Sequence, residues 1–173
     1  MDYEKLVPCQ LRELNLSCFG CCGNEFSSKE EILEEIEENS KEFSTLGKKP
    51  SKDELKSFRD RYGKQVLSQK GLCYSLVDFG KGCVGCPLHQ KVKEILPKSS
   101  NLTLEIDEDL RIGECDVNYE CDTFKYWKLM SLSQREDFVK WVKEKEFSNY
   151  DYSIENIEGR LIRLFFEEMG WSI

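Results

Sequence analysis

Three cysteines stand close together near the amino terminus, at Cys18, Cys21 and Cys22. Thiolates are the protein ligands that suit zinc and iron–sulfur clusters, so these side chains are the first candidates for chemistry. Gly20 and Gly23 stand on either side of the adjacent cysteines. Glycine permits backbone conformations with positive φ, which let a chain fold its amides around a bound ion. This stretch predicts a metal centre.

A second pair of cysteines has the same short spacing, because Cys83 and Cys86 are separated by two residues, as Cys18 and Cys21 are. Two thiols of one tight turn can reach the same ion, and two such turns complete a tetrahedral site with zinc–sulfur distances of about 2.3 Å. Neighbouring side chains generally diverge. We therefore expect Cys21 and Cys22 to serve two different ions, or one of their sulfurs to bridge two metals.

Eight thiols would complete two four-thiolate sites, with Cys9 as a spare thiol that is a possible further ligand. The predicted ligands are Cys18, Cys21, Cys22, Cys73, Cys83, Cys86, Cys115 and Cys121. A bridged cluster of two metals would need fewer thiols, and His89 could replace one of them. His89 is the only histidine of the chain, which excludes sites that need two or three imidazoles.

Zn²⁺ is the metal that these spacings favour, with iron or an iron–sulfur cluster as the alternative, because four-thiolate sites hold both. The sequence Cys86-Pro87 is also similar to the Cys-Pro ending of ferredoxin-type ligand runs, in which the thiols are more closely spaced. A disulfide framework is disfavoured, because the nine cysteines are an odd number and a reducing cytoplasm is the expected location.

The cysteine pattern resembles the zinc- or iron-chelating domain family named for its CxxCxxCC motif. The resemblance rests on Cys18, Cys21 and Cys22, followed by Cys73 and the later pair, and it extends from position 15 to position 89. The chain departs from the motif at its first cysteine, which is Asn15 here, and it lacks the Tyr-x2-Arg-Pro-x2-Cys segment of the family. The resemblance implies metal chelation and leaves the biological role open.

Three functions compete. The first is a metal-binding protein whose ions are structural or chelated, and the second is an iron–sulfur, redox or metal-carrier protein. The third is a zinc-dependent enzyme with an open site, built from Cys83, Cys86 and His89 with Asp116 or Glu120 as the base. No motif identifies a catalytic residue, so the sequence favours a protein that is not an enzyme.

Composition limits the partners. The 173 residues carry a net charge of −8, and no run of Lys and Arg is long enough to neutralise phosphates or an anionic membrane surface. We therefore expect metal ions as partners and neither nucleic acid nor a membrane. No segment approaches the roughly 20 apolar residues that span a bilayer, and the amino terminus lacks the apolar core of a secretory signal, which favours the cytoplasm.

The elements that must position these thiols are expected to be helical. We predict one compact domain over residues 1–173, mainly α, with five or six helices, at most a small β-ribbon, and metal as a staple. Its expected parts are a lead-in over residues 1–17, a cysteine-bearing part over 18–122 and a carboxyl-terminal helical part over 123–173.

Capping boxes predict helix starts at Ser28, Ser51 and Ser133, because each serine is followed by a glutamate three residues later. Apolar residues at helical spacing extend the second of these helices through Val66. Further helices are expected after Cys86, which would be the amino-terminal cap, and over a continuous final helix from residue 153 to residue 170. Strands are predicted over residues 72–79 and 102–106.

Overall fold

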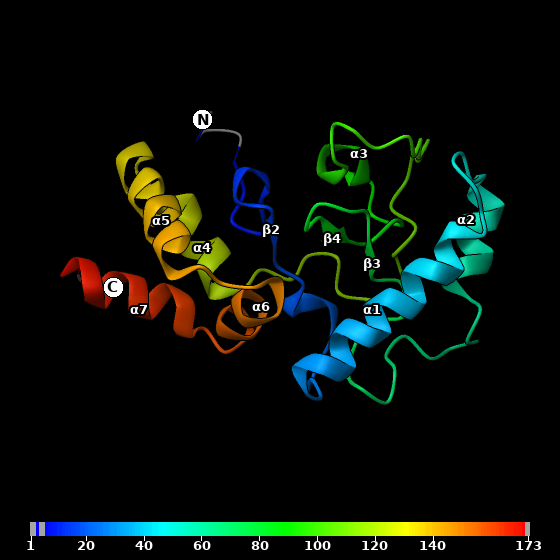
Figure 1. The fold of residues 1–173 in the computed structure, drawn as a ribbon, viewed down its shortest axis with the longest axis horizontal. Helices are drawn as coiled ribbons and strands as arrows, with labels where there is room; N and C mark the ends of the chain where they lie inside the picture. The colour runs from blue at the N-terminus through cyan, green and yellow to red at the C-terminus, as the bar shows by residue number, and fades with distance from the viewer. Residues whose placement is uncertain (1–2, 4–5, 172–173) are drawn as a thin grey trace. The chain divides into compact units, whose positions relative to one another are not determined.

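The computed structural model describes Tyr3 and residues 6–171, and the chain divides into two compact units (Figure 1). Unit 1 comprises Met1–Cys21 and Tyr119–Ile173, and unit 2 comprises Cys22–Asn118. The described residues are mainly helical, with two small antiparallel sheets, which confirms the predicted helical class. The predicted lead-in over residues 1–17 lies partly outside the described residues. A search of the described residues for a helix able to cross a bilayer finds none.

Unit 1 combines an amino-terminal hairpin with the carboxyl-terminal helices (Figure 1). Its elements are β1 (Gln10–Leu11), the 3₁₀ turn η1 (Arg12–Leu14), β2 (Leu16–Ser17), α4 (Asp122–Leu129), α5 (Leu132–Lys145), α6 (Asn149–Ile157) and α7 (Arg160–Met169). A further 3₁₀ turn, η2 (Gly20–Cys22), stands where unit 1 passes into unit 2. β1 pairs with β2 in antiparallel register, with Leu11 opposite Leu16.

Aromatic side chains from three helices form the core of unit 1. Trp127 of α4, Phe138 of α5 and Phe165 of α7 are almost fully buried. The rings of Phe138 and Phe165 meet edge to face with centroids 5.1 Å apart, a favourable geometry for aromatic pairs. Leu11 and Leu16 of the hairpin belong to the same core, so the hairpin is held against the helices by apolar packing.

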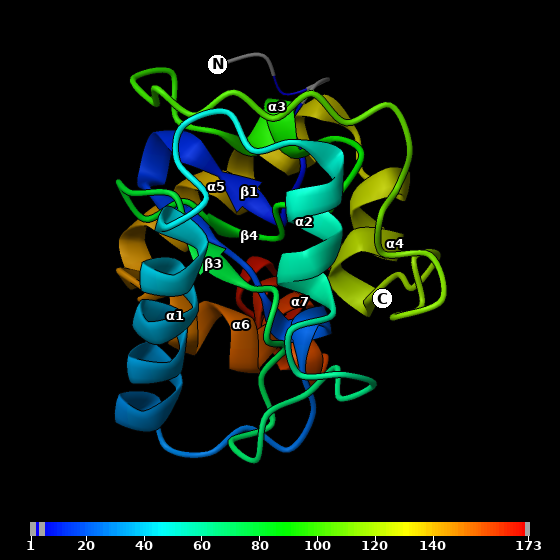
Figure 2. The same cartoon turned by 90° about the vertical axis from the view of Figure 1, so that its right-hand side faces the viewer.

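Unit 2 has fewer regular elements. They are α1 (Lys29–Ser44), α2 (Lys52–Arg59), β3 (Val77–Asp78), β4 (Val84–Gly85) and the single turn α3 (Val92–Ile95). β3 and β4 pair in antiparallel register, and α1 packs along β3 (Figure 2). Their shared core includes Phe43, Leu55, Val77 and Leu104.

Two of the predicted capping boxes are confirmed. The Ser28 hydroxyl accepts the backbone N–H of Glu31, whose carboxylate accepts the N–H of Ser28, and the same reciprocal pair joins Ser51 and Glu54. The third box is wrong by two residues. Ser131 is the amino-terminal cap of α5, with Gln134 as its partner, because the chain is extended at Met130.

Several predicted elements are shorter than expected. α2 ends at Arg59, well before Val66, and the predicted strand over residues 72–79 is reduced to β3. The final helix is broken, because Gly159 adopts a left-handed conformation with φ of 65° between α6 and α7. No strand forms over residues 102–106, all of which the structure describes. There the apolar alternation places Leu104 and Ile106 in the core of unit 2.

Candidate metal centres

Cys9 and Cys18 are neighbours across the hairpin of unit 1. The N–H of Cys18 donates to the carbonyl of Cys9 at 2.9 Å, directly beyond the pairing of Gln10 with Ser17. The turn between the strands is closed by Asn15, which adopts the left-handed conformation with φ of 51° that asparagine tolerates well. The hairpin thus places Cys9 beside Cys18, although the spacing of the cysteines in the sequence does not pair them.

Four thiols gather in unit 1. Burial raises the pKa of Cys9 well above its usual value, and the thiols of Cys18, Cys121 and Cys21 raise it further. Burial also raises the pKa of Cys18 to about 12, although the Gly20 amide, by hydrogen bonding to its sulfur, acts in the opposite direction. Each thiol of this group is therefore close enough to the others to oppose their ionisation.

Cys121 belongs to the carboxyl-terminal segment of unit 1. It occupies the amino-terminal cap position of α4 with extended backbone. Burial raises its pKa, while the amides of Phe124 and Thr123 in the first turn of α4 lower it. A helix amino terminus favours a thiolate, which makes this a good position for a metal ligand. From the sequence, Cys86 is expected at such a cap position. That prediction is wrong, because α3 begins only at Val92.

Helix α6 supports the backbone that carries these thiols. The hydroxyl of Ser153 accepts the N–H of Phe19 at 2.9 Å, and the side chain of Asn149 accepts the N–H of Ser17 at 2.8 Å. The hydroxyl of Tyr152 donates to the carbonyl of Pro8 at 2.8 Å, beside Cys9. Residues on one helix thus hold both strands of the hairpin next to their cysteines.

Gly20 lies against α6 so closely that a side chain would not fit. A Cβ at this position would lie 2.6 Å from the carbonyl oxygen of Ser153 and 3.3 Å from the Cβ of Ile157. We expect Gly20→Ala to lower the free energy of unfolding of the protein by about 1–3 kcal/mol, measured by urea denaturation. Gly63→Asn is the matched control, because Gly63 has positive φ in open space and should tolerate asparagine. Equal stability of the two variants would contradict this tight contact.

Cys22 and Cys73 are brought together in unit 2 by backbone pairing. The N–H of Cys73 donates to the carbonyl of Cys22 at 2.8 Å, next to an antiparallel bridge between Gly23 and Leu72. This contact repeats the relation of Cys9 and Cys18 in unit 1. The adjacent residues Cys21 and Cys22 fall on opposite sides of the boundary between the units.

Cys86 and Cys115 belong to the same neighbourhood of unit 2. Burial raises the pKa of Cys86, and the thiols of Cys73 and Cys115 raise it further. The amide of Leu88 and the guanidinium of Arg111 act in the opposite direction. Cys115 is exposed, as Cys21 is in unit 1.

Cys83 makes packing contacts with α3 and the turn between β3 and β4. It is buried, and its thiol donates to the carbonyl of Ile95 in α3. The N–H of Phe79 also donates to the carbonyl of Cys83, so this cysteine is built into the short turn between β3 and β4. Its contacts are those of a packed core residue.

His89 follows Cys86 in the chain, and its backbone N–H donates to the carbonyl of Cys86 at 3.2 Å. Its Nδ1 accepts the N–H of Lys91 at 2.9 Å, and burial together with the charge of Arg111 lowers its pKa. Because Nδ1 accepts this hydrogen bond, a neutral imidazole here carries its proton on Nε2, so neither ring nitrogen offers a free lone pair to a metal. Of the two candidate bases, Asp116 closes a turn by accepting the N–H of Asn118, and Glu120 belongs to unit 1.

In the part of the chain that the structure describes, no group of three or more His, Cys, Asp or Glu side chains is arranged to hold one metal ion. All nine cysteines are described, and each carries a thiol.

Comparison of the chain with protein-family models, with curated proteins and with solved structures finds no significant match. The resemblance to the CxxCxxCC domain family therefore stays a prediction.

Cys9 is the thiol that the spacing of the cysteines left as a spare and only possible ligand, although the structure places it beside Cys18. The signal was present, because Asn15 is a common turn residue and the apolar residues Leu11 and Leu16 stand on either side of it. A hairpin centred there would have placed Cys9 opposite Cys18.

Proposed function

We propose that this protein binds metal through two four-thiolate centres, one in each unit. The observation that carries the proposal is the mutual opposition of four thiols in unit 1. The ligands proposed for unit 1 are Cys9, Cys18, Cys21 and Cys121. Those proposed for unit 2 are Cys22, Cys73, Cys86 and Cys115. Compared with the assignment from spacing, Cys9 takes the place of Cys83, and His89 lies outside the ligand set.

The electrostatics of the thiols support this proposal. Thiolates that are crowded and desolvated repel one another, so such a group is unfavourable as four anions. A bound cation reverses the balance, because metal ligation deprotonates a thiol outright. Backbone amides also lower the pKa of Cys18, Cys86 and Cys121, and they therefore stabilise the thiolate form of each. A bound cation would therefore stabilise the thiols of each group as thiolates.

Four thiolates suit both of the metals expected from the sequence, which are zinc and an iron–sulfur cluster. Zn²⁺ requires four sulfurs at about 2.3 Å from one ion, so the side chains would have to turn inward around it. An iron–sulfur cluster binds its cysteines through separate iron atoms and so holds their sulfurs farther apart.

A structural role is the simplest function for such centres, because thiolate–metal bonds contribute directly to the stability of a fold. In unit 1 the metal would join the hairpin to the start of α4, and in unit 2 it would join three irregular segments. An iron–sulfur cluster would add the capacity to carry an electron. The proposal agrees with the chelation that the CxxCxxCC resemblance implies. It places the protein in a reducing compartment such as the cytoplasm, with metal ions as its partners and no catalytic step.

Elemental analysis and a visible absorption spectrum of protein purified without oxygen test this proposal. We expect two centres per chain, as two zinc ions in a colourless protein or as two iron–sulfur clusters in a coloured one. A protein that contains no metal, and that binds none when zinc or iron and sulfide are supplied, would overturn the proposal. For zinc, the ratio of metal to protein separates two centres from one; for iron, the absorption spectrum must first identify the type of cluster.

A further inference from the structure

We propose that Cys9 and Cys18 of unit 1 form a redox site, in which a small-molecule disulfide of the glutathione type oxidises the two thiols to a reversible disulfide bond. The site uses the sulfurs themselves and needs no bound metal, so it goes beyond the proposed function. Disulfides of proteins in a reducing compartment are usually transient and redox-sensing. The proposal therefore concerns a bond that opens and closes, and not the structural framework that an odd number of cysteines disfavours.

The backbone of the hairpin holds the two cysteines within the range that a disulfide requires. Gln10 pairs with Ser17, and directly beyond this pair the N–H of Cys18 donates to the carbonyl of Cys9 at 2.9 Å. With standard bond lengths, such a contact keeps the two Cα atoms within about 6.8 Å of each other. Cysteines joined by a disulfide have Cα atoms about 4.4–6.8 Å apart. The bond can therefore form without a change in the pairing of the strands.

The thiols of this pair are close enough to interact, and both are accessible. Burial raises the pKa of Cys9, and among the thiols that raise it further, that of Cys18 has the largest effect. Both cysteines are half-buried, whereas Cys83 of unit 2 is buried. A half-buried sulfur keeps surface that a small-molecule disulfide can reach from solvent. Cys9 and Cys18 thus combine access with a second thiol held beside the first.

Helix α6 fixes the chain on both sides of the pair. The two residues that flank Cys18 donate their N–H groups to side chains of α6 at 2.8 and 2.9 Å. On the same helix, the hydroxyl of Tyr152 donates to the carbonyl of Pro8, which precedes Cys9, at 2.8 Å. Both thiols are therefore presented by backbone that is tied to one helix, which reduces the conformational entropy lost when the bond closes.

The exchange takes two steps, in which electrons and protons balance. The thiolate of one cysteine attacks a sulfur of glutathione disulfide, so that a mixed disulfide forms and one glutathione thiolate leaves. The second cysteine, after losing its proton to water, attacks the protein sulfur of the mixed disulfide, and the second glutathione thiolate leaves. Two electrons pass from the protein to glutathione, and the two glutathione thiolates take up the two protons that the cysteines lost. Excess reduced glutathione reverses both steps.

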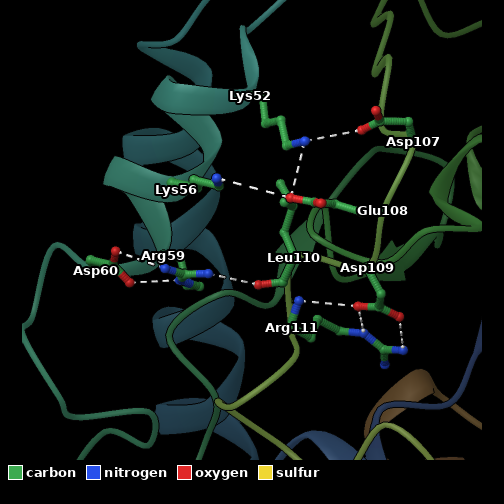
Figure 3. A network of polar contacts seen from close by, with 9 residues as sticks. All are labelled: Lys52, Lys56, Arg59, Asp60, Asp107, Glu108, Asp109, Leu110 and Arg111. Atoms are coloured by element: carbon green, nitrogen blue, oxygen red, sulfur yellow. Dashed lines mark hydrogen bonds and ion pairs between the residues drawn. The ribbon is translucent and has the colours of Figure 1, made fainter.

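Cys115 of unit 2 is placed in another way and gives a reference for an accessible thiol. It is exposed, and its backbone N–H donates to the carbonyl of Arg111, in its own turn, at 3.4 Å. The segment before this turn is anchored to α2, where Nη1 of Arg59 donates to the carbonyl of Leu110 at 3.0 Å (Figure 3). An exposed thiol is open to glutathione, so modification of Cys115 shows that the oxidant has reached the chain.

Mass spectrometry after oxidation tests the proposal on the full chain. The chain is reduced, freed of metal by a chelator, and oxidised with mixtures of reduced and oxidised glutathione, after which iodoacetamide blocks the remaining thiols. Trypsin places Cys9 and Cys18 in separate peptides, residues 6–12 and 13–29, which a disulfide joins. Fragmentation of the joined peptides assigns the bond to Cys18 rather than to the other cysteines of its peptide.

We expect the bond between Cys9 and Cys18 to form more readily in the folded chain than in concentrated urea, because folding holds the two thiols together. At a fixed concentration of reduced glutathione, half-oxidation should need at least about tenfold less glutathione disulfide in the folded chain. Cys83→Ser is the matched control, since Cys83 is buried in unit 2, and it should give the same value as the unsubstituted chain. Dithiothreitol should return both thiols.

A bond from Cys9 to Cys121 or to Cys21 in the folded chain would overturn the assignment of this pair. So would mixed disulfides at both cysteines without closure, or a bond that forms no more readily in the folded chain than in urea. Because the metal is removed first, a chain that binds no metal would count against the proposed function and leave this test unaffected. If circular dichroism shows that chelation unfolds the chain, the protein is oxidised as purified, and absence of the bond there equally contradicts the proposal.

Discussion

Replacing Cys9 with serine is expected to remove the metal of unit 1 and to leave that of unit 2 in place. Cys9 is the ligand that the hairpin, rather than sequence spacing, assigns, because its carbonyl accepts the N–H of Cys18 and its thiol lies near three others. A serine oxygen is a poor substitute for a thiolate at a soft-metal site. Elemental analysis of the full-length variant should therefore show half the metal content of the unsubstituted protein.

Cys83→Ser is the matched control for this prediction. Cys83 belongs to a short-spaced cysteine pair, but its thiol donates to the carbonyl of Ile95, a contact that a serine hydroxyl can keep. We expect this variant to bind both metals and to lose little stability. The opposite result, with Cys9→Ser retaining both metals and Cys83→Ser losing one, would restore the assignment from spacing.

Sequence reasoning succeeds in this protein where a feature depends on contacts between residues close in the chain. Capping boxes at Ser28 and Ser51 depend on contacts within four residues, and the structure has both. The adjacent pair Cys21 and Cys22 was predicted to serve two sites because neighbouring side chains diverge. The boundary between the two units falls between these residues, and the double site stays a prediction that metal analysis must test.

Contacts between distant segments could not be predicted in this way. Cys121 joins Cys9 and Cys18 only because the carboxyl-terminal helices fold against the amino-terminal hairpin, through packing that involves residues such as Leu11 and Phe165. The pairing of Cys22 with Cys73 likewise depends on backbone hydrogen bonds between segments separated by α1 and α2. Local patterns carry no record of which distant segments meet, so the grouping of the thiols had to come from the fold.

Removing the metal is expected to unfold unit 2 while leaving much of the helical structure of unit 1. Unit 2 ends in a long run, residues 96–118, that contains no helix or strand although every residue of it is described. Such a run inside a compact unit is uncommon without a specific constraint. Unit 1 instead has four helices around an aromatic core. A structural zinc site contributes on the order of 10 kcal/mol to folding, which exceeds the margin of most small domains.

Hydrogen exchange measures, segment by segment, how much structure each unit loses when a chelator removes the metal from the reduced protein. The N–H groups of Thr103 and Leu110, which donate to the carbonyls of Lys48 and Leu88, should lose their protection in unit 2. The amides of α5 in unit 1 should exchange slowly both before and after chelation, because Phe138 and Val142 are buried in an aromatic core that we expect to persist without metal. Readdition of the metal should restore protection in unit 2, which controls for irreversible damage. Unchanged protection at Thr103 and Leu110 after complete chelation would show that their segment folds without metal, and the structural role proposed for the unit 2 centre would then be wrong.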